Sequence, residues 1–365
     1  MKQHTPRQTA AALTASTTLA VDLAKRVFQI AAEDALGQVT CGQRIKSRQA
    51  FAAFLRSLPV ELTVLMETGP GAQAWARQLL AQGNAVRILP AQLVAQHRSG
   101  AKNDRNDALA ILRAGHDSSI AAVPIKSVDA LTMQALHRAR RGYTRRHTAL
   151  GNQMRGLLLE HGIALAQGDA AIVRRVPLTL EDASVPELLR ELMAELLAEW
   201  EHLGQRIQAM NGKLQEAARQ SPKARQFVSI RGFGPIISSA LLAKQTEPQR
   251  FANARQFPAY FGIVPEQRSS GNKVRLGKMS KRGDGYLRAL VIEGAHAVLR
   301  NLKADSQRLD DQRLLRWIKR HGRKGAAIRL ANRNLRIAWV LLQSDECYCA
   351  EPLRQAAQLE DSQMN

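Results

Sequence analysis

The sequence predicts an α/β domain at the N-terminus, a middle region of long helices and a mainly helical C-terminal domain. Short apolar segments with strand spacing alternate with helical segments as far as about residue 126. From 127 to 220 this strand character is lost, and Leu, Met and Ala recur at the spacing of a helix. We therefore expect disordered tails over 1–16 and 346–365, and domains over 17–126, 127–224 and 225–345.

The N-terminal elements follow a defined order. An apolar segment ends at Asp22, two more strand-like segments follow, and a fourth ends at Glu67. This β-β-β-α-β-α-β-α order is that of the ribonuclease H-like fold, in which the first three strands form a meander and the fourth lies beside the first. The expected strands cover 18–22, 27–32, 38–45, 62–67 and 85–89, and the expected helices cover 48–57, 72–82, 91–97 and 105–115.

Helical spacing continues through Leu131–Leu159 and Leu188–Leu214, with a hinge expected near 162–177. Two long helices joined in this way would run antiparallel and form a coiled coil. In the C-terminal domain, Ile230–Ala243 has a Gly-x-Gly turn that enters an apolar helix. This pattern is typical of a helix-hairpin-helix, whose backbone N–H groups can bind phosphate, although a plain helical turn fits it equally well. A further helix is expected over 286–302.

The composition indicates a nucleic-acid partner. The 365 residues include 53 Lys and Arg against 31 Asp and Glu, a formal net charge of +22. Aromatic residues make up only 4%, so rows of stacked bases are not expected to dominate recognition. Cys41, Cys347 and Cys349 have neither zinc-type spacing nor a disulfide pattern, and no apolar run approaches membrane-spanning length. We expect a cytoplasmic protein without a membrane partner.

Positive charge is concentrated in three places. The first long helix has no acidic residue between Ala130 and Leu159, which favours a stripe that tracks phosphates over an ordinary solvated face. Its arginines are Arg138, Arg140, Arg141, Arg145, Arg146 and Arg155, and of these we expect Arg138, Arg141, Arg145 and Arg146 to bind nucleic acid. The second place is the serine- and glycine-rich loop 268–288, with candidate phosphate ligands Arg268, Lys273, Arg275, Lys278, Lys281 and Arg282. The third is 313–336, with nine Lys or Arg and no acid.

Four carboxylates form a candidate metal site. Asp22 and Glu67 end strands that are neighbours in the expected sheet, so their side chains can meet at one edge. Asp104 and Asp107 are three residues apart at a helix start and share one face. A helix N-cap would explain Asp104 alone and a first-turn dipole partner would explain Asp107 alone, but neither explains the two strand-end acids. Carboxylates grouped in a basic protein predict Mg²⁺, two ions per site, acting on a phosphodiester.

Four motifs, in their order and spacing, resemble those of the DEDD transposases of insertion-sequence family 110. They are Val21-Asp-Leu-Ala-Lys25, Met66-Glu-Thr-Gly69, Lys102-Asn-Asp-Arg-Asn-Asp-Ala108 and the serine loop. The segments Ser269-Ser-Gly-Asn-Lys273 and Ser280–Arg288 are similar to the 1111 subgroup, and the likeness runs from about residue 17 to about 340. Two positions depart from the family pattern. Ala24 stands where a Ser is usual, and Glu67-Thr-Gly is one residue shorter than Glu-Ala-Thr-Gly.

The resemblance implies a RuvC-like N-terminal domain, a coiled-coil middle and a C-terminal transposase domain whose nucleophilic serine matches Ser270. It also implies tetramers guided by a bridge RNA that pairs with donor and target DNA. In such tetramers, the acidic cluster of one subunit and the serine of another would form a composite site. The expected function is therefore strand cleavage and exchange in DNA transposition.

The activation of the serine decides between mechanisms. A hydroxyl is a weak nucleophile until a base or a metal ion takes its proton, and the nearest histidine in sequence is His296. Metal-bound carboxylates could activate Ser270, with Ser269 as the rival nucleophile, and a phosphoserine would conserve bond energy for strand exchange. Two other functions stay open. One is a RuvC-type junction nuclease that activates water and needs no serine, and the other is a non-catalytic nucleic-acid-binding scaffold.

Overall fold

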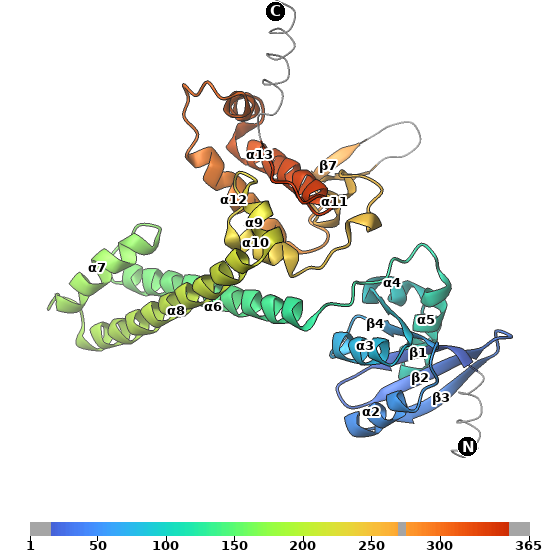
Figure 1. Ribbon diagram of the computed structural model, residues 1–365. Helices are drawn as coiled ribbons and strands as arrows, with labels where there is room; N and C mark the ends of the chain where they lie inside the picture. Colours follow the sequence, from blue (N-terminus) through green and yellow to red (C-terminus); the bar gives the residue numbers. More distant parts are fainter. Residues whose placement is uncertain (1–15, 269–274, 350–365) are drawn as a thin grey trace, which may run out of the picture. The chain divides into compact units, whose positions relative to one another are not determined.

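A computed structural model describes residues 16–268 and 275–349, so the expected tails lie mostly outside the described residues. The chain forms two compact units that meet in sequence at Ser127 and Val128, and each is described here by itself. Figure 1 shows the first unit in blue to teal and the second in green to red. None of the described helices is long and apolar enough to cross a membrane.

The first unit is built on a five-stranded mixed sheet. Its strands are β1 (Ser16–Leu23), β2 (Phe28–Asp34), β3 (Val39–Ile45), β4 (Thr63–Glu67) and β5 (Ala85–Leu89). The spatial order is β3-β2-β1-β4-β5, with antiparallel pairing from β3 to β1 and parallel pairing from β1 to β5. The expected meander, with the fourth strand beside the first, is therefore confirmed.

Helices cover both faces of this sheet. The alternation of side chains along β1 sends Leu19 and Val21 into a core with α2 (Arg48–Arg56) and α3 (Ala72–Ala81), where Phe28 and Phe51 stack with ring centroids 4.0 Å apart. Ala20 points to the other face and packs in a core with α5 (Asp104–His116). The short α4 (Ala91–Val94) and a 3₁₀ turn (Ala95–His97) lead towards α5. Each residue of β1 and β4 can therefore be assigned to a face by its parity.

The second unit begins with three helices, α6 (Val128–Glu160), α7 (Asp169–Glu181) and α8 (Glu187–Gln220). Figure 1 shows α6 and α8 running side by side. Arg140 contacts Asn211, and His147 contacts Trp200, so residue numbers fall along α8 as they rise along α6. The two long helices are therefore antiparallel, as expected.

The hinge expected over 162–177 is wrong in part, because α7 occupies most of it and holds Pro177 in its interior. Proline removes a helical hydrogen bond and usually ends a helix, which is why the sequence favoured a hinge. Ile172 and Val176 of α7 are fully buried in a core with Met154 and Met193 of the long helices. This burial stabilises the helix against the cost of the proline.

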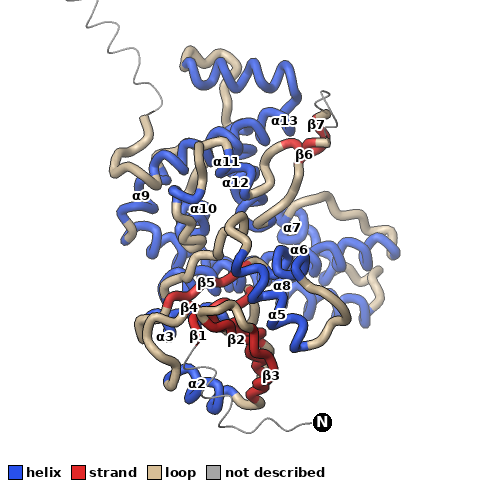
Figure 2. Tube along the Cα trace, turned by 90° about the vertical axis from the view of Figure 1, so that its right-hand side faces the viewer, coloured by secondary structure: helices blue, strands red, loops and turns tan. Residues whose placement is uncertain are grey.

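The rest of the second unit is mainly helical. Its helices are α9 (Pro222–Val228), α10 (Pro235–Leu242), α11 (Gln256–Tyr260), α12 (Gly285–Arg300) and α13 (Leu309–Leu341), with a 3₁₀ turn at Pro248–Arg250. They share one core that includes Phe227, Phe257 and Phe261. α13 is broken at Gly322, whose φ of 69° is disfavoured for residues with a side chain. The two strands β6 (Pro265–Gln267) and β7 (Leu276–Met279) pair antiparallel, and Figure 2 shows them in red beside these helices.

Candidate active site and nucleic-acid interface

The sheet brings Asp22 and Glu67 to the same edge and the same face. In the parallel pair of β1 and β4, Val21 lies opposite Met66, so the next residue on each strand is one of the two acids. Asp22 has the parity of Ala20, and Glu67 has that of Leu65, and both of these apolar residues pack in the core with α5. Both carboxylates therefore point to the α5 side of the sheet.

The start of α5 supplies the other two acids. Asn103, and not Asp104, is the N-cap, and its side-chain oxygen accepts a hydrogen bond from the Asn106 N–H at 2.8 Å. Asp104 and Asp107 are therefore not needed as the cap. Asp104 forms an ion pair with Arg44 at 3.2 Å, and Asp107 forms one with Arg98 at 2.5 Å.

The four carboxylates act on one another electrostatically. Burial, and then the charges of Glu67, Asp107 and Asp104, raise the pKa of Asp22 from 3.8 to about 6, against a smaller lowering effect of Arg98. Burial and the charge of Asp107 also raise the pKa of Glu67, while Arg98 and Lys102 oppose the rise. The negative charges of ionised Asp22 and Glu67 are therefore not fully balanced by positive charges of the protein.

The donor set fits a hard divalent cation in chemistry. All four groups are carboxylates, the ligands that Mg²⁺ prefers, and burial together with repulsion between carboxylates raises the pKa values of Asp22 and Glu67. Their present grouping is looser than a metal centre, because no three His, Cys, Asp or Glu side chains in the described chain are close enough to hold an ion together. Arg44 and Arg98 hold Asp104 and Asp107 by ion pairs, and a cation would compete with these guanidinium groups.

The arginines of α6 divide into two sets, those with hydrogen-bond partners within the protein and those that are exposed. Arg140 donates a hydrogen bond to Asn211 at 2.5 Å, and Arg155 donates to the carbonyls of Ala166 and Gly168 at 3.2 and 2.8 Å. These two are engaged inside the protein. The exposed set is the one predicted to bind nucleic acid, Arg138, Arg141, Arg145 and Arg146.

The serine loop lies between β6 and β7 in the sequence, and Ser269, Ser270 and Lys273 are outside the described residues. On either side of them, the Arg268 N–H donates to the Arg275 carbonyl at 2.8 Å. The side chain of Arg268 forms an exposed ion pair with Glu266 at 3.1 Å, and Arg275 and Lys278 are exposed. Lys281 and Arg282, after β7, are exposed as well.

The segment that follows the loop has a structural task. Asp284 caps α12 by accepting from the N–H groups of Tyr286 and Leu287, and it pairs with Lys244. Although burial favours the neutral acid, this ion pair and the two N–H donors hold the pKa of Asp284 below its usual range. Gly283 has a φ of 77°, and a Cβ there would lie 2.1 Å from the Tyr260 carbonyl oxygen. The glycine and the acid of this motif therefore shape the fold.

The antiparallel strands β6 and β7 form a hairpin, and a groove beside it was not identified from the sequence. It has a volume of about 600 Å³ and is lined by Pro265 of β6, Met279 of β7 and a stretch of α13 that includes Trp317. Arg313, Arg329, Arg333 and Arg336 also line it. Arg333 is engaged with Asp310 and Tyr348, whereas Arg329 and Arg336 are exposed. The sequence indicated this groove only by the run of Lys and Arg over 313–336, and that run does not show which of these residues lie beside the hairpin.

Comparisons with protein families match both units. A family model for a DEDD-type domain, described as "Transposase", matches residues 19–163. A second model, described as "Transposase IS116/IS110/IS902 family", matches residues 224–309. The first match spans all four candidate carboxylates, and the second spans the segment from α9 to the start of α13.

Curated relatives cover nearly the whole chain. A probable family 20 transposase of Pseudomonas aeruginosa is 39% identical over 335 residues, which is 90% of this chain and 98% of the relative. The transposase for insertion sequence element IS1111A of Coxiella burnetii is 35% identical over 90% of each chain. The transposase for insertion sequence element IS1328 of Yersinia enterocolitica is 32% identical over 89% of this chain and 96% of the relative.

Proposed function

The chain belongs to the transposase IS116/IS110/IS902 family, and on that premise we propose that it cleaves and exchanges DNA strands with a carboxylate-held metal site and a serine nucleophile. The activity of the family is DNA transposition, and the DEDD domain identifies the chain as an enzyme that acts on DNA. The observation that carries the proposal is the placement of Asp22 and Glu67 at one edge of the sheet on its α5 side, where burial and the charge of Asp107 raise both pKa values.

A DEDD domain implies a divalent metal ion. In our proposal the ions are Mg²⁺, two per site, held by Asp22, Glu67, Asp104 and Asp107. The ions would neutralise charge on the scissile phosphate and on the attacking and leaving oxygens. The chain's own contribution is the edge of the sheet, which positions Asp22 and Glu67, and the Asn103 cap, so that Asp104 and Asp107 are not used to cap α5.

The serine step conserves the phosphodiester energy. The Ser270 hydroxyl oxygen attacks phosphorus, an O–P bond to serine forms, and the bond from phosphorus to one sugar oxygen breaks. A carboxylate of the acidic cluster takes the serine proton, and the released sugar oxygen takes up a proton to become a hydroxyl. Attack by the hydroxyl of a second strand then reverses these changes, regenerates serine and joins the new strand, without ATP.

The assembly we propose is a homotetramer on donor and target DNA, guided by a bridge RNA. Ser270 of one subunit would act with the acidic cluster of another. The high positive charge, the four exposed arginines of α6, and the cations next to the hairpin support binding to several nucleic-acid strands. The long antiparallel pair of α6 and α8 supports a role in association, with exposed Leu188 and Leu192 on α8.

The metal site is tested by single substitutions that keep side-chain shape. Asp22→Asn, Glu67→Gln, Asp104→Asn and Asp107→Asn should each abolish strand exchange while nucleic-acid binding and the fold are retained. The matched control is Glu33→Gln in β2, since Glu33 pairs with His116 and has no part in the cluster. Chelation of Mg²⁺ should reproduce the loss. If three of the four variants keep wild-type exchange, the acids do not form the site.

The serine is tested by trapping the reaction on DNA, denaturing the protein and searching for a nucleotide remnant on the peptide that contains residues 269 and 270. Ser270→Ala should eliminate this adduct while complex formation persists, and Ser269→Ala should cost much less. An adduct that survives Ser270→Ala would move the nucleophile to another residue. Cleavage by the wild type without any adduct would indicate metal-activated water, as in a junction nuclease.

A further inference from the structure

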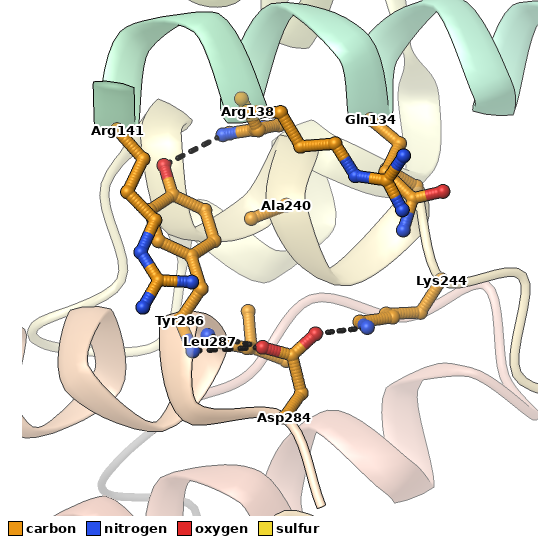
Figure 3. A pocket seen from close by; sticks show the side chains of 10 residues that line it. Gln134, Arg138, Arg141, Ala240, Lys244, Asp284, Tyr286 and Leu287 are labelled. Carbon is orange, nitrogen blue, oxygen red and sulfur yellow. Dashed lines mark hydrogen bonds and ion pairs between the residues drawn. The ribbon is translucent and has the colours of Figure 1, made fainter. Parts of the chain in front are cut away.

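The second unit contains a cavity of about 260 Å³ between α6, α10 and α12, at a site with no assigned function. Figure 3 shows its arrangement, with Arg138 and Arg141 of α6 on one side, the Lys244–Asp284 pair on the opposite side and Ala240 of α10 between them. The arginines are exposed, whereas Ala240, Ala243 and Leu287 are buried. The cavity therefore has a cationic rim at its solvent side and an apolar floor.

The rim carries uncompensated positive charge. Lys244 and Asp284 neutralise each other by their ion pair. Arg138 has no carboxylate or carbonyl partner among the described residues, and Arg141 lies over the Tyr286 ring at 5.6 Å from its centroid. Figure 3 shows the Arg141 guanidinium beside Tyr286 and the Arg138 side chain extending towards Gln134, so the two groups lie at different ends of the cavity. Each can donate two parallel hydrogen bonds to a phosphate.

The polar groups of the inner wall satisfy one another. The two ring nitrogens of His137, which is 3% exposed, lie 3.0 Å from the Tyr286 hydroxyl and 3.1 Å from the Ser239 hydroxyl. Ser239 donates to the Ile236 carbonyl, so its oxygen accepts from the histidine, and the other ring nitrogen accepts from Tyr286. Burial, and then the charge of Arg140, lower the pKa of His137 to about 4, which keeps the wall uncharged at neutral pH.

This combination of rim and floor suits a flat, neutral ring attached to an anion. A free phosphate would use the arginines but leave the apolar floor empty, and an aliphatic group would leave the arginines unpaired. The volume is slightly below the roughly 300–1,000 Å³ of pockets that hold drug-sized ligands, so it suits one base and not a stack of bases. Gln134 lines the wall beside Arg138.

We propose that the cavity binds one unpaired nucleotide of a strand, with the base among α6, α10 and α12 and the backbone phosphates on its two sides on Arg138 and Arg141. The inference rests on the proposed nucleic-acid role and specifies its ligand as a single base outside any duplex. The cost of unstacking that base is a few kcal/mol in a duplex and least in strands that are already single, so bulges and loops would be preferred. A ribonucleotide and a deoxyribonucleotide share this chemistry.

The test uses the full-length protein and short single strands that carry one 2-aminopurine, in ribose and deoxyribose forms. Insertion of the base should separate it from its neighbours and raise its fluorescence, and the same strand in a duplex should give no rise. The sugar form with the larger rise identifies the source of the nucleotide. Ala240→Leu should fill the floor, abolish the rise and weaken single-strand binding about tenfold, whereas Ala209→Leu, on an exposed site of α8, should change neither.

A second variant separates the rim from the floor. Arg138→Gln should lower the slope of log affinity against log salt by about 0.7 for single strands, while Ala240→Leu should leave that slope unchanged. If Ala240→Leu lowers the melting temperature, the test uses wild-type protein and a series of strands that each lack one base. Affinity should then fall for only one position of the missing base. No fluorescence rise with either sugar, or equal losses at every abasic position, would overturn the proposal. Strand exchange and the serine adduct are measured separately, so this failure would leave the proposed activity standing.

Discussion

The exposed arginines of α6 allow the sharpest test of how the protein binds nucleic acid. Replacing Arg138, Arg141, Arg145 and Arg146 together by Gln removes four charges that face solvent, and the described residues provide no ion-pair partner for any of them. Each phosphate contact contributes about 0.9 to the salt slope for duplex DNA and about 0.7 for a single strand. The quadruple variant should therefore lose about 3.6 or about 2.8 from the slope.

These slopes translate into a measurable change. Between 50 and 200 mM salt, a concentration ratio of about four, the wild type should lose roughly 50- to 150-fold more affinity than the variant. The assay is fluorescence anisotropy of labelled duplex and single strands at several salt concentrations. Affinity and slope that both match the wild type would refute the view that this face of α6 tracks phosphates.

Arg140 and Arg155 provide the matched controls on the same helix. Arg140 is two residues beyond Arg138, which places it about 200° around the helix axis, and its guanidinium is bonded to Asn211. Arg140→Gln and Arg155→Gln should leave the salt slope unchanged. They should instead lower stability by about 0.5–1.5 kcal/mol, because the Asn211 side chain and the carbonyls of Ala166 and Gly168 lose their hydrogen-bond donors. Slopes that fall equally in the controls would show that net charge matters and position does not.

Three further predictions concern other parts of the molecule. The raised pKa of Asp22 means that the folded, metal-free protein binds this proton more tightly than the unfolded chain, so stability falls as pH rises from 3.8 towards about 6. Asp22→Asn should raise the melting temperature of chelator-treated protein at neutral pH and flatten this dependence, and a lower melting temperature would contradict the electrostatic argument. Gly283→Ala should destabilise the second unit by about 2–4 kcal/mol in denaturant titrations, whereas Gly142→Ala, with nothing near its Cβ, should not destabilise it. In the groove beside the hairpin, Arg329→Gln and Arg336→Gln should each lower the duplex salt slope by about 0.9, and unchanged slopes would exclude the groove as a binding surface.

The strand-end acids could be assigned to one site from the sequence because a β-strand has a strict period. Once a strand is known to end at Asp22 or Glu67, parity fixes the face of each side chain, and parallel neighbours bring their ends together. The tertiary structure confirmed the sheet order on which this reasoning depended. The sequence analysis allowed Asp104 as the cap of its helix, and the observed hydrogen bond to the Asn106 N–H assigns that position to Asn103.

Other features could not be predicted because they depend on contacts between residues far apart in the chain. Pro177 has a strong local preference against helix interiors, but burial of Ile172 and Val176 against α6 and α8 outweighs it. The cavity beside Arg138 is similar, because α6, α10 and α12 contribute walls from three separate segments. The spacing of residues along one helix does not show which other helices pack against it.

The sequence by itself determined that the protein is strongly basic, that strands precede long helices, and that the two strand-end acids, Asp22 and Glu67, lie at one edge of a sheet. These properties follow from composition and from periods of two or 3.6 residues, which are local. Only the tertiary structure showed which partners hold the other arginines of α6 within the protein. Arg138 and Arg140 look alike in the sequence, yet Asn211, 71 residues away, binds one of them and leaves the other exposed. A hydrogen-bond partner at that distance is fixed by the packing of α8 on α6, which no local pattern specifies.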